Sequence, residues 1–267
     1  MSEIKALLSD SDGTLVDTVN LIRHGQFEAA HEYLTRHGIP DESLPDYPTY
    51  EDALHKVLGG RTRDTIESTV RLLYESQPHH LNGIDFDELY ALLDPVQDKL
   101  APDYIKPYPG LAETLTHLGR SGIMLAIISS GDQRMIVRNI GIALPELGLT
   151  TLYLDTTKSN QAKMDIFERT VKETFKLPGF TVVTSDDTTK HKPDPEAPNL
   201  AMQRLGVGPH ESAGLGDHSI DMRTFINAGI DRRIGVTHGF DDRVTLEAAG
   251  ATNIIDSFGE LPAILLA

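Results

Sequence analysis

Short apolar runs alternate with longer helix-like segments along most of this chain, and that alternation constrains the fold more than any other feature. The apolar runs lie at Ile4–Ser9, Ile123–Ser129, Phe180–Thr184, Ala213–Gly216, Arg233–Val236 and Asn253–Ile255. Several of them end in a small residue or are followed by an acidic one. Strands that alternate with helices favour a parallel sheet with helices on both faces. The sequence therefore predicts an α/β fold with a doubly wound parallel sheet.

Polar residues stand where three of these runs end. In open α/β sheets, ligands bind beyond the carboxyl ends of the strands. Asp10 follows the first run, Ser129 ends the second, and Asp217 follows the fourth. These three residues are therefore candidates for a functional site.

Residues 19–107 have a different pattern. Apolar residues recur there at helical spacing, as in Ile66, Val70 and Leu73, and no convincing strand interrupts them. This pattern predicts an all-helical domain at 19–107, inserted into a core domain formed by 1–18 and 108–267. An insertion after the first strand would place the helical domain over the strand ends.

Composition excludes several classes of function. The 24 Lys and Arg against 40 Asp and Glu give a net charge of −16, which disfavours nucleic acid and anionic membranes as partners. With no cysteine, disulfides, thiolate zinc sites and cysteine nucleophiles are impossible. No stretch approaches the ~20 apolar residues of a membrane span, and we expect a cytoplasmic protein.

Asp10 and Asp12 place two carboxyl groups two residues apart where the chain leaves the first strand. Like charges this close raise the pKa of one group and favour a bound cation or a shared proton, as in catalytic and metal sites. A surface turn would also use Asp and Gly, so the pair alone leaves both interpretations open.

Further segments resolve that ambiguity. The segment Asp10–Thr18 resembles the first motif of the haloacid dehalogenase-like hydrolase superfamily. Ser129, Lys192 in His-Lys-Pro-Asp-Pro, and Asp217–Asp221 resemble the second, third and fourth motifs, in the same order. The chain is most similar to the branch of phosphoglycolate phosphatases and β-phosphoglucomutases. That resemblance implies a Rossmann-like core with a helical cap.

The resemblance also implies a mechanism. Asp10 would be the nucleophile that forms an aspartyl-phosphate. Asp12 would protonate the leaving alcohol and then deprotonate the attacking water. Ser129, with Ser130, would bind the phosphoryl oxygens, and Lys192 would offset the negative charge of Asp10 and phosphate.

A hard divalent cation, Mg²⁺, is the implied cofactor. Its ligands would be the carboxylates of Asp10 and Asp217 and the main-chain carbonyl of Asp12, with Asp221 acting through water. Asp217 and Asp221 at i and i+4 would otherwise mark a solvated helix start.

Asp12 and the cap sequence argue against two activities found in the superfamily. A haloacid dehalogenase lacks an acid at the position of Asp12. A phosphonate hydrolase needs a cap lysine in the segment Leu58–Arg63, where the basic residues of this chain are arginines. A sugar-phosphate mutase carries a hinge histidine where this chain has Ile22, although His24 is close. A phosphatase is therefore favoured, with a phosphomutase as the alternative and a non-enzymatic binding module as a weaker one.

Arg61 and Arg63, beside Gly59 and Gly60, are the cap candidates for substrate selection, because arginine binds carboxylate or phosphate in a bidentate manner. A helix start with solvated arginines is the competing interpretation. The predicted partner is a small phosphorylated metabolite such as phosphoglycolate or a sugar phosphate, bound by a monomer or homodimer.

Between Ser129 and Lys192 the chain is longer than this resemblance implies. The surplus is expected at 143–178, with an amphipathic helix at 165–175, and a dimer contact and a second lid are the two alternatives for its role.

Overall fold

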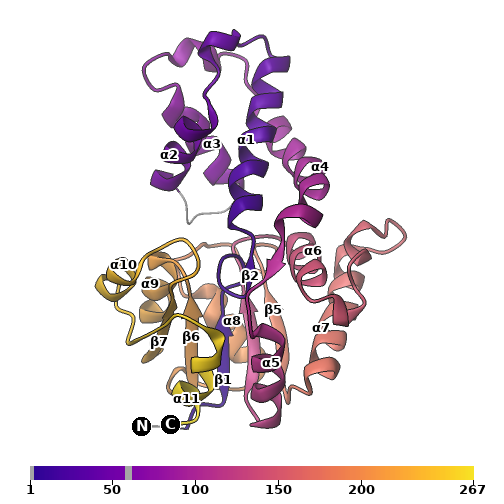
Figure 1. The fold of residues 1–267 in the computed structure, drawn as a ribbon, viewed down its shortest axis with the longest axis vertical. Coiled ribbons are helices and arrows are strands. Elements are labelled where there is room, and N and C mark those ends of the chain that lie inside the picture. Colours follow the sequence, from indigo (N-terminus) through magenta and orange to yellow (C-terminus); the bar gives the residue numbers. More distant parts are fainter. Residues whose placement is uncertain (1–2, 58–61) are drawn as a thin grey trace. The chain divides into compact units, whose positions relative to one another are not determined.

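The computed structural model describes residues 3–57 and 62–267. These residues form two compact units, one built from residues up to Asp17 together with Ile105–Ala267, and the other from Thr18–Tyr104. Figure 1 shows the first unit as a sheet between helices and the second as helices alone.

A six-stranded parallel sheet forms the centre of the first unit. Its strands are β1 (Ala6–Ser9), β4 (Met124–Ile128), β5 (Phe180–Val183), β6 (Ser212–Gly216), β7 (Arg232–Val236) and β8 (Asn253–Ile255). They lie in the order β5-β4-β1-β6-β7-β8, and every neighbouring pair is parallel. The predicted α/β fold is confirmed, and each of the six predicted runs contains a strand.

Both faces of this sheet are buried, as parallel sheets require. Side chains alternate across a strand, so Ala6 and Leu8 point into a core with Met202 and Phe225, while Leu7 of the same strand is fully buried on the opposite face. The helices of this unit are α5 (Leu111–Arg120), α6 (Gln133–Ala143), α7 (Asn160–Phe175), α8 (Glu196–Leu205), α9 (Ser219–Asn227), α10 (Arg243–Ala248) and α11 (Leu261–Leu265).

The expected amphipathic helix is α7. Its buried residues Met164, Phe167, Val171 and Phe175 recur at intervals of three and four, which places them on one face. The helix packs against α5, α6 and strand β5. Helix α7 thus covers the part of the sheet next to β5.

Side chains clamp the outer edge of β5, the first strand of the sheet. Glu168 Oε1 of α7 accepts a 2.6 Å hydrogen bond from Val182 N, and Arg204 Nη1 of α8 donates one of 2.6 Å to Val182 O. Arg204 is itself held by Asp187, at 2.6 Å. The backbone groups of Val182, which a further strand would need, are therefore already paired.

Among its described residues, the second unit contains four α-helices, α1 (Val19–Arg36), α2 (Tyr47–Val57), α3 (Thr62–Leu73) and α4 (Phe86–Tyr104). Helix α1 packs along α4, and α2 packs on α3. Helix α4 continues through Pro95 and Pro102 to its end at Tyr104. Within the described ranges, no helix is both long and apolar enough to span a bilayer.

A two-stranded antiparallel ribbon lies in the first unit where the chain leaves it and returns. Strand β2 (Val16–Asp17) pairs with β3 (Lys106–Pro107), with Val16 opposite Pro107 and Asp17 opposite Lys106. The sequence did not predict this ribbon, because two residues are too few to show a period.

Candidate active site

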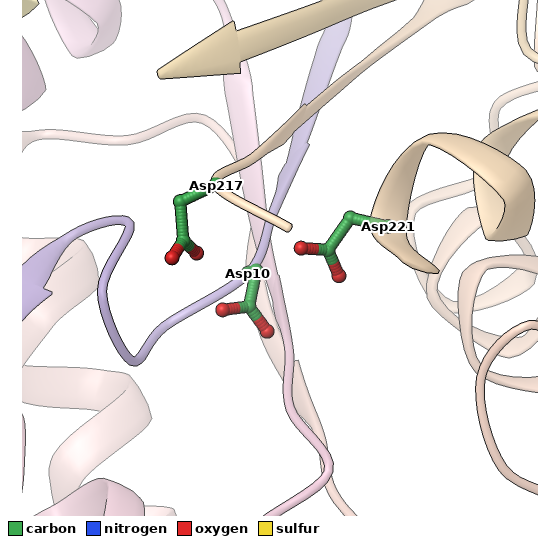
Figure 2. A group of neighbouring side chains, drawn as sticks. All are labelled: Asp10, Asp217 and Asp221. Atoms are coloured by element: carbon green, nitrogen blue, oxygen red, sulfur yellow. The ribbon is translucent and has the colours of Figure 1, made fainter. Parts of the chain in front are cut away.

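Three aspartates converge at the carboxyl end of the sheet. Asp10 directly follows β1, Asp217 follows the neighbouring strand β6, and Asp221 lies in the first turn of α9. Strands β1 and β6 are parallel and pair Ser9 with Leu215, so their ends deliver Asp10 and Asp217 to the same place. One carboxylate oxygen from each of the three lies within 4.8 Å of the others (Figure 2). All three residues are buried.

Close backbone packing fixes the position of Asp217. Gly13 adopts φ +81°, and a Cβ at Gly13 or at Gly239 would collide with Asp217 Oδ2. Phe240 N also donates to Asp217 Oδ2 at 2.8 Å. The loop after β1 and the loop after β7 thus enclose this carboxylate, and both need a residue without a side chain there.

Lys192 is the cation of the cluster. Its Nζ lies 2.5 Å from Asp10 Oδ1 and 2.7 Å from Asp221 Oδ1, and the residue is only 9 % exposed. Burial alone would lower the pKa of Lys192, but the charges of Asp10 and Asp221 outweigh that effect and raise it. Lys192 therefore stays protonated at neutral pH.

The aspartates have strongly perturbed pKa values. The pKa of Asp10 is raised to about 7, chiefly by burial and also by the charge of Asp221, against the opposing effect of Lys192. Burial, followed by the charges of Asp10 and Asp221, raises the pKa of Asp217 well above its usual value. With all three carboxylates ionised, the single ammonium would leave two negative charges uncompensated, so a divalent cation would match the cluster in charge as well as in oxygen donors.

Thr14 and His238 support the cluster, although sequence reasoning assigned a role to neither of them. Thr14 Oγ1 donates to Asp217 Oδ1 at 2.5 Å and lies 3.5 Å from Asp10 Oδ2. His238 Nε2 donates to the Thr14 carbonyl at 3.0 Å, and Tyr108 OH donates to the His238 carbonyl, also at 3.0 Å. Burial lowers the pKa of His238. The neutral ring can make this bond with its single N–H.

Asp12 is held by a residue that the sequence analysis did not single out. Asn139 Nδ2 of α6 donates to Asp12 Oδ1 at 2.7 Å, although the two residues are 127 positions apart. Asn139 is 3 % exposed. A single asparagine inside a helix carries no local pattern that would have revealed this contact.

The two serines follow β4. Ser129 is buried, and its Oγ accepts a 3.0 Å hydrogen bond from Gly131 N, which turns the Ser129 O–H away from that amide. Ser130 is half-buried in the same loop. Each of the two strands that flank β1 is thus followed directly by a residue of the predicted motifs, Ser129 after β4 and Asp217 after β6.

The predicted cap residues divide into two groups. Arg61 lies outside the described residues, together with Gly59 and Gly60. Arg63, in α3, forms an ion pair with Asp87 of α4, and half of its side chain is exposed. His24 is stacked between Tyr47 and Tyr104, with ring centroids 4.3 and 5.1 Å away.

Comparison with known proteins identifies the family. The family model described as haloacid dehalogenase-like hydrolase matches residues 4–229, which is most of the chain. The chain belongs to the haloacid dehalogenase-like hydrolases. The predicted family is thereby confirmed, and the buried aspartate cluster is of the kind that holds the metal ion in this family.

Relatives of this hydrolase match along nearly its whole length. Pyrophosphatase PpaX of Bacillus velezensis is 24% identical over 258 residues, covering 97% of this chain and 94% of the relative. The structure of a predicted phosphoglycolate phosphatase from Haemophilus somnus aligns with TM-score 0.73 at 17% identity, covering 99% of both chains. That of CbbY from Rhodobacter sphaeroides aligns with TM-score 0.62 at 21% identity, covering 98% of this chain and 99% of the other. The two structures support the fold.

Proposed function

We propose that this hydrolase is a Mg²⁺-dependent phosphatase that cleaves a small phosphomonoester through an aspartyl-phosphate. The observation that carries the proposal is the buried cluster around Asp10, in which one carboxylate directly follows the central strand beside a protonated lysine and two further carboxylates. A phosphoryl group brings more negative charge into that space, and a site of this kind must compensate it.

Asp10 acts as the nucleophile in this proposal. Lys192 holds Asp10 Oδ1 at 2.5 Å, which orients the carboxylate and favours its ionised form. An Asp10 oxygen attacks phosphorus while the bond from phosphorus to the ester oxygen breaks, and Asp12 gives a proton to the departing alkoxide. In the second half, Asp12 takes a proton from water as the water oxygen attacks phosphorus and the Asp10 carboxylate is released.

The remaining residues bind the phosphoryl group. The Ser129 hydroxyl, turned from Gly131 N, donates to a phosphoryl oxygen, and Ser130 lies beside it. Lys192 is the compact positive charge that offsets both Asp10 and the phosphoryl group. Because these groups lie in loops that follow β4 and β5, the sheet holds them in register with Asp10.

The metal ligands in this proposal are Asp10, Asp217 and the main-chain carbonyl of Asp12. When bound, Mg²⁺ neutralises charge on the phosphoryl oxygens. Asp221 Oδ1 already accepts from Lys192 at 2.7 Å and Asp221 Oδ2 from His218 N at 3.2 Å. Two direct donors on Asp221 favour a contact to the metal through water.

Substrate choice is assigned to the helical unit, with Arg61 and Arg63 as the residues that grip the non-reacting end. Phosphoglycolate and sugar phosphates are the proposed substrates, and the names of the relatives add pyrophosphate to the compounds to be assayed. A phosphomutase remains the alternative. It would yield an isomer of the sugar phosphate, whereas a phosphatase releases inorganic phosphate.

The experiment is a screen of phosphorylated metabolites and pyrophosphate, with Mg²⁺ and with EDTA, in which released phosphate and sugar-phosphate isomers are both measured. Asp10→Asn should keep the fold while abolishing turnover and covalent phosphorylation. A folded Asp10→Asn protein with near wild-type turnover would contradict the mechanism.

A further inference from the structure

Two adjacent buried polar residues on α6 form a chain that ends on Asp12. Arg138 is 1 % exposed and is among the largest fully buried side chains of the described residues. Its Nε donates to Asn139 Oδ1 at 3.0 Å, and Asn139 Nδ2 donates to Asp12 Oδ1 at 2.7 Å. Burying an arginine is costly, so its pairing with Asn139 calls for a physical explanation.

Arg138 determines which way the Asn139 amide faces. A guanidinium has only N–H donors, so the group that meets Arg138 Nε has to be the amide oxygen of Asn139. Reversing the amide would bring its NH₂ group against the Nε–H, donor against donor. The NH₂ group of Asn139 is therefore directed at Asp12 and remains there whatever the protonation state of Asp12.

A fixed donor restricts where Asp12 can carry a proton. If neutral Asp12 held its proton on Oδ1, the Asn139 N–H would face a hydroxyl oxygen at 2.7 Å, which is a weaker acceptor than a carbonyl oxygen. With the proton on Oδ2, Oδ1 remains an acceptor in both the neutral and the ionised forms. The hydrogen bond is then kept throughout a cycle in which Asp12 must be neutral first and ionised later.

We propose that Asn139, oriented by Arg138, is a positioning residue that makes Asp12 Oδ2 the oxygen that gives and takes the proton. This inference rests on the proposed function, in which Asp12 is the acid and base. In the first half, the Oδ2–H bond breaks and the proton passes to the leaving alkoxide as its bond to phosphorus breaks. In the second half, Oδ2 takes a proton from the attacking water.

The test compares phenyl phosphate with p-nitrophenyl phosphate, which have similar shapes but different leaving groups. Phenolate needs a proton from Asp12, whereas p-nitrophenolate leaves readily without one. In Asn139→Leu, kcat/KM for phenyl phosphate should fall on the order of tenfold more than kcat/KM for p-nitrophenyl phosphate. KM should change little, because Asn139 does not touch the phosphoryl group in this proposal.

A second variant protects the test against loss of folding. Asn139→Ala removes the amide without adding bulk or charge and offers no N–H to Asp12, so it should show the same selective loss. Thr114→Val is the matched control, since it removes another buried side-chain hydrogen bond, from Thr114 Oγ1 to the Phe258 carbonyl. It should leave the ratio of the two substrates unchanged.

The outcomes separate the two proposals. If the wild-type protein is active and its folded Asn139 variants keep the wild-type ratio of kcat/KM for the two substrates, the role of Asn139 is overturned and the proposed function is not. An equal loss on both substrates also leaves that ratio unchanged. A wild-type protein that hydrolyses neither substrate nor any phosphomonoester of the screen overturns the proposed function and this inference together.

Discussion

At the scale of single residues, the site depends as much on missing side chains as on charged ones. Gly13 and Gly239 come from loops more than two hundred positions apart, yet each leaves room for the same carboxylate of Asp217. The charged residues themselves follow strands in an ordered set of motifs, which is why the sequence indicated them. Which residues would support them, such as Thr14 and Asn139, depends on tertiary contacts that no local pattern records.

Gly239→Ala tests how tightly Asp217 is held. The new Cβ would overlap Asp217 Oδ2, so the carboxylate has to move away from Asp10 and Asp221. We expect kcat/KM to fall on the order of a hundredfold, because small displacements of a reacting group have effects of that size, and the Mg²⁺ concentration for half-maximal rate to rise. Gly259→Ala is the control, since the nearest atom to its Cβ is 3.9 Å away. If Gly239→Ala reached its half-maximal rate at the same Mg²⁺ concentration as the wild type, the prediction that Gly239 holds Asp217 in place would be refuted.

His238 should make stability depend on pH. Burial lowers its pKa in the folded state, against smaller opposing effects of Thr14 and Asp17. Between the lowered folded pKa and the unfolded value of about 6.5, the unfolded chain binds more protons, so His238 costs stability as pH falls through that window. His238→Gln keeps a donor for the Thr14 carbonyl but does not titrate. Urea unfolding at pH 7.5 and 5.5 should therefore show a larger loss for the wild type than for the variant. An equal loss of stability between pH 7.5 and 5.5 in the wild type and in His238→Gln would contradict this prediction.

At the scale of elements, the apolar runs located all six strands of the sheet, and the errors were confined to one or two residues at their ends. Helical spacing likewise found the helices of the inserted unit. Proline does not mark the end of α4, because the helix runs through Pro102 to Tyr104. Pro107 lies in the ribbon, where its missing N–H is tolerated because the pair is only two residues long.

The clamped edge of β5 should protect the protein from self-association. Glu168→Ala leaves the amide of Val182 without its acceptor, and Val182 is only 2 % exposed. We expect a loss of about 1–3 kcal/mol in the free energy of unfolding and more dimer or aggregate at high concentration. Glu168→Gln keeps an oxygen acceptor and should stay close to wild type. Urea titration would measure the free energy of unfolding, and sedimentation velocity would measure self-association. Wild-type behaviour of both variants in both measurements would show that the clamp is unimportant.

At the scale of the whole molecule, the chemistry and the choice of substrate are assigned to different units. Every motif residue of the proposed mechanism lies in the unit that contains the sheet. The motifs therefore indicate the reaction but carry no information about the alcohol that is released. In the proposed function, that information lies in the helical unit, whose shape apolar periodicity does not specify.

Arg63 offers a way to examine this division of roles. Its ion pair with Asp87 is largely exposed, so its loss should cost less than about 1 kcal/mol of stability. Of Arg61→Ala and Arg63→Ala, at least one should lower kcat/KM on the order of tenfold for the best metabolite of the screen, while p-nitrophenyl phosphate is unaffected. Asp87→Ala removes the same ion pair but keeps the arginine, and it should behave like wild type. Unchanged kinetics in both arginine variants would remove them from substrate selection.

The short ribbon of β2 and β3 has a consequence for how such a protein can change over time. Asp17 and Lys106 face each other across it, so the inserted helices begin and end at neighbouring points of the host chain. Paired residues of antiparallel strands lie only about 5 Å apart, a gap that a tight turn can close. We therefore expect that the whole insertion between Asp17 and Lys106 can be replaced by another, by recombination or by design, without a change in the strands of the sheet. The ribbon is thus a site at which a different inserted domain can be joined to the same catalytic core.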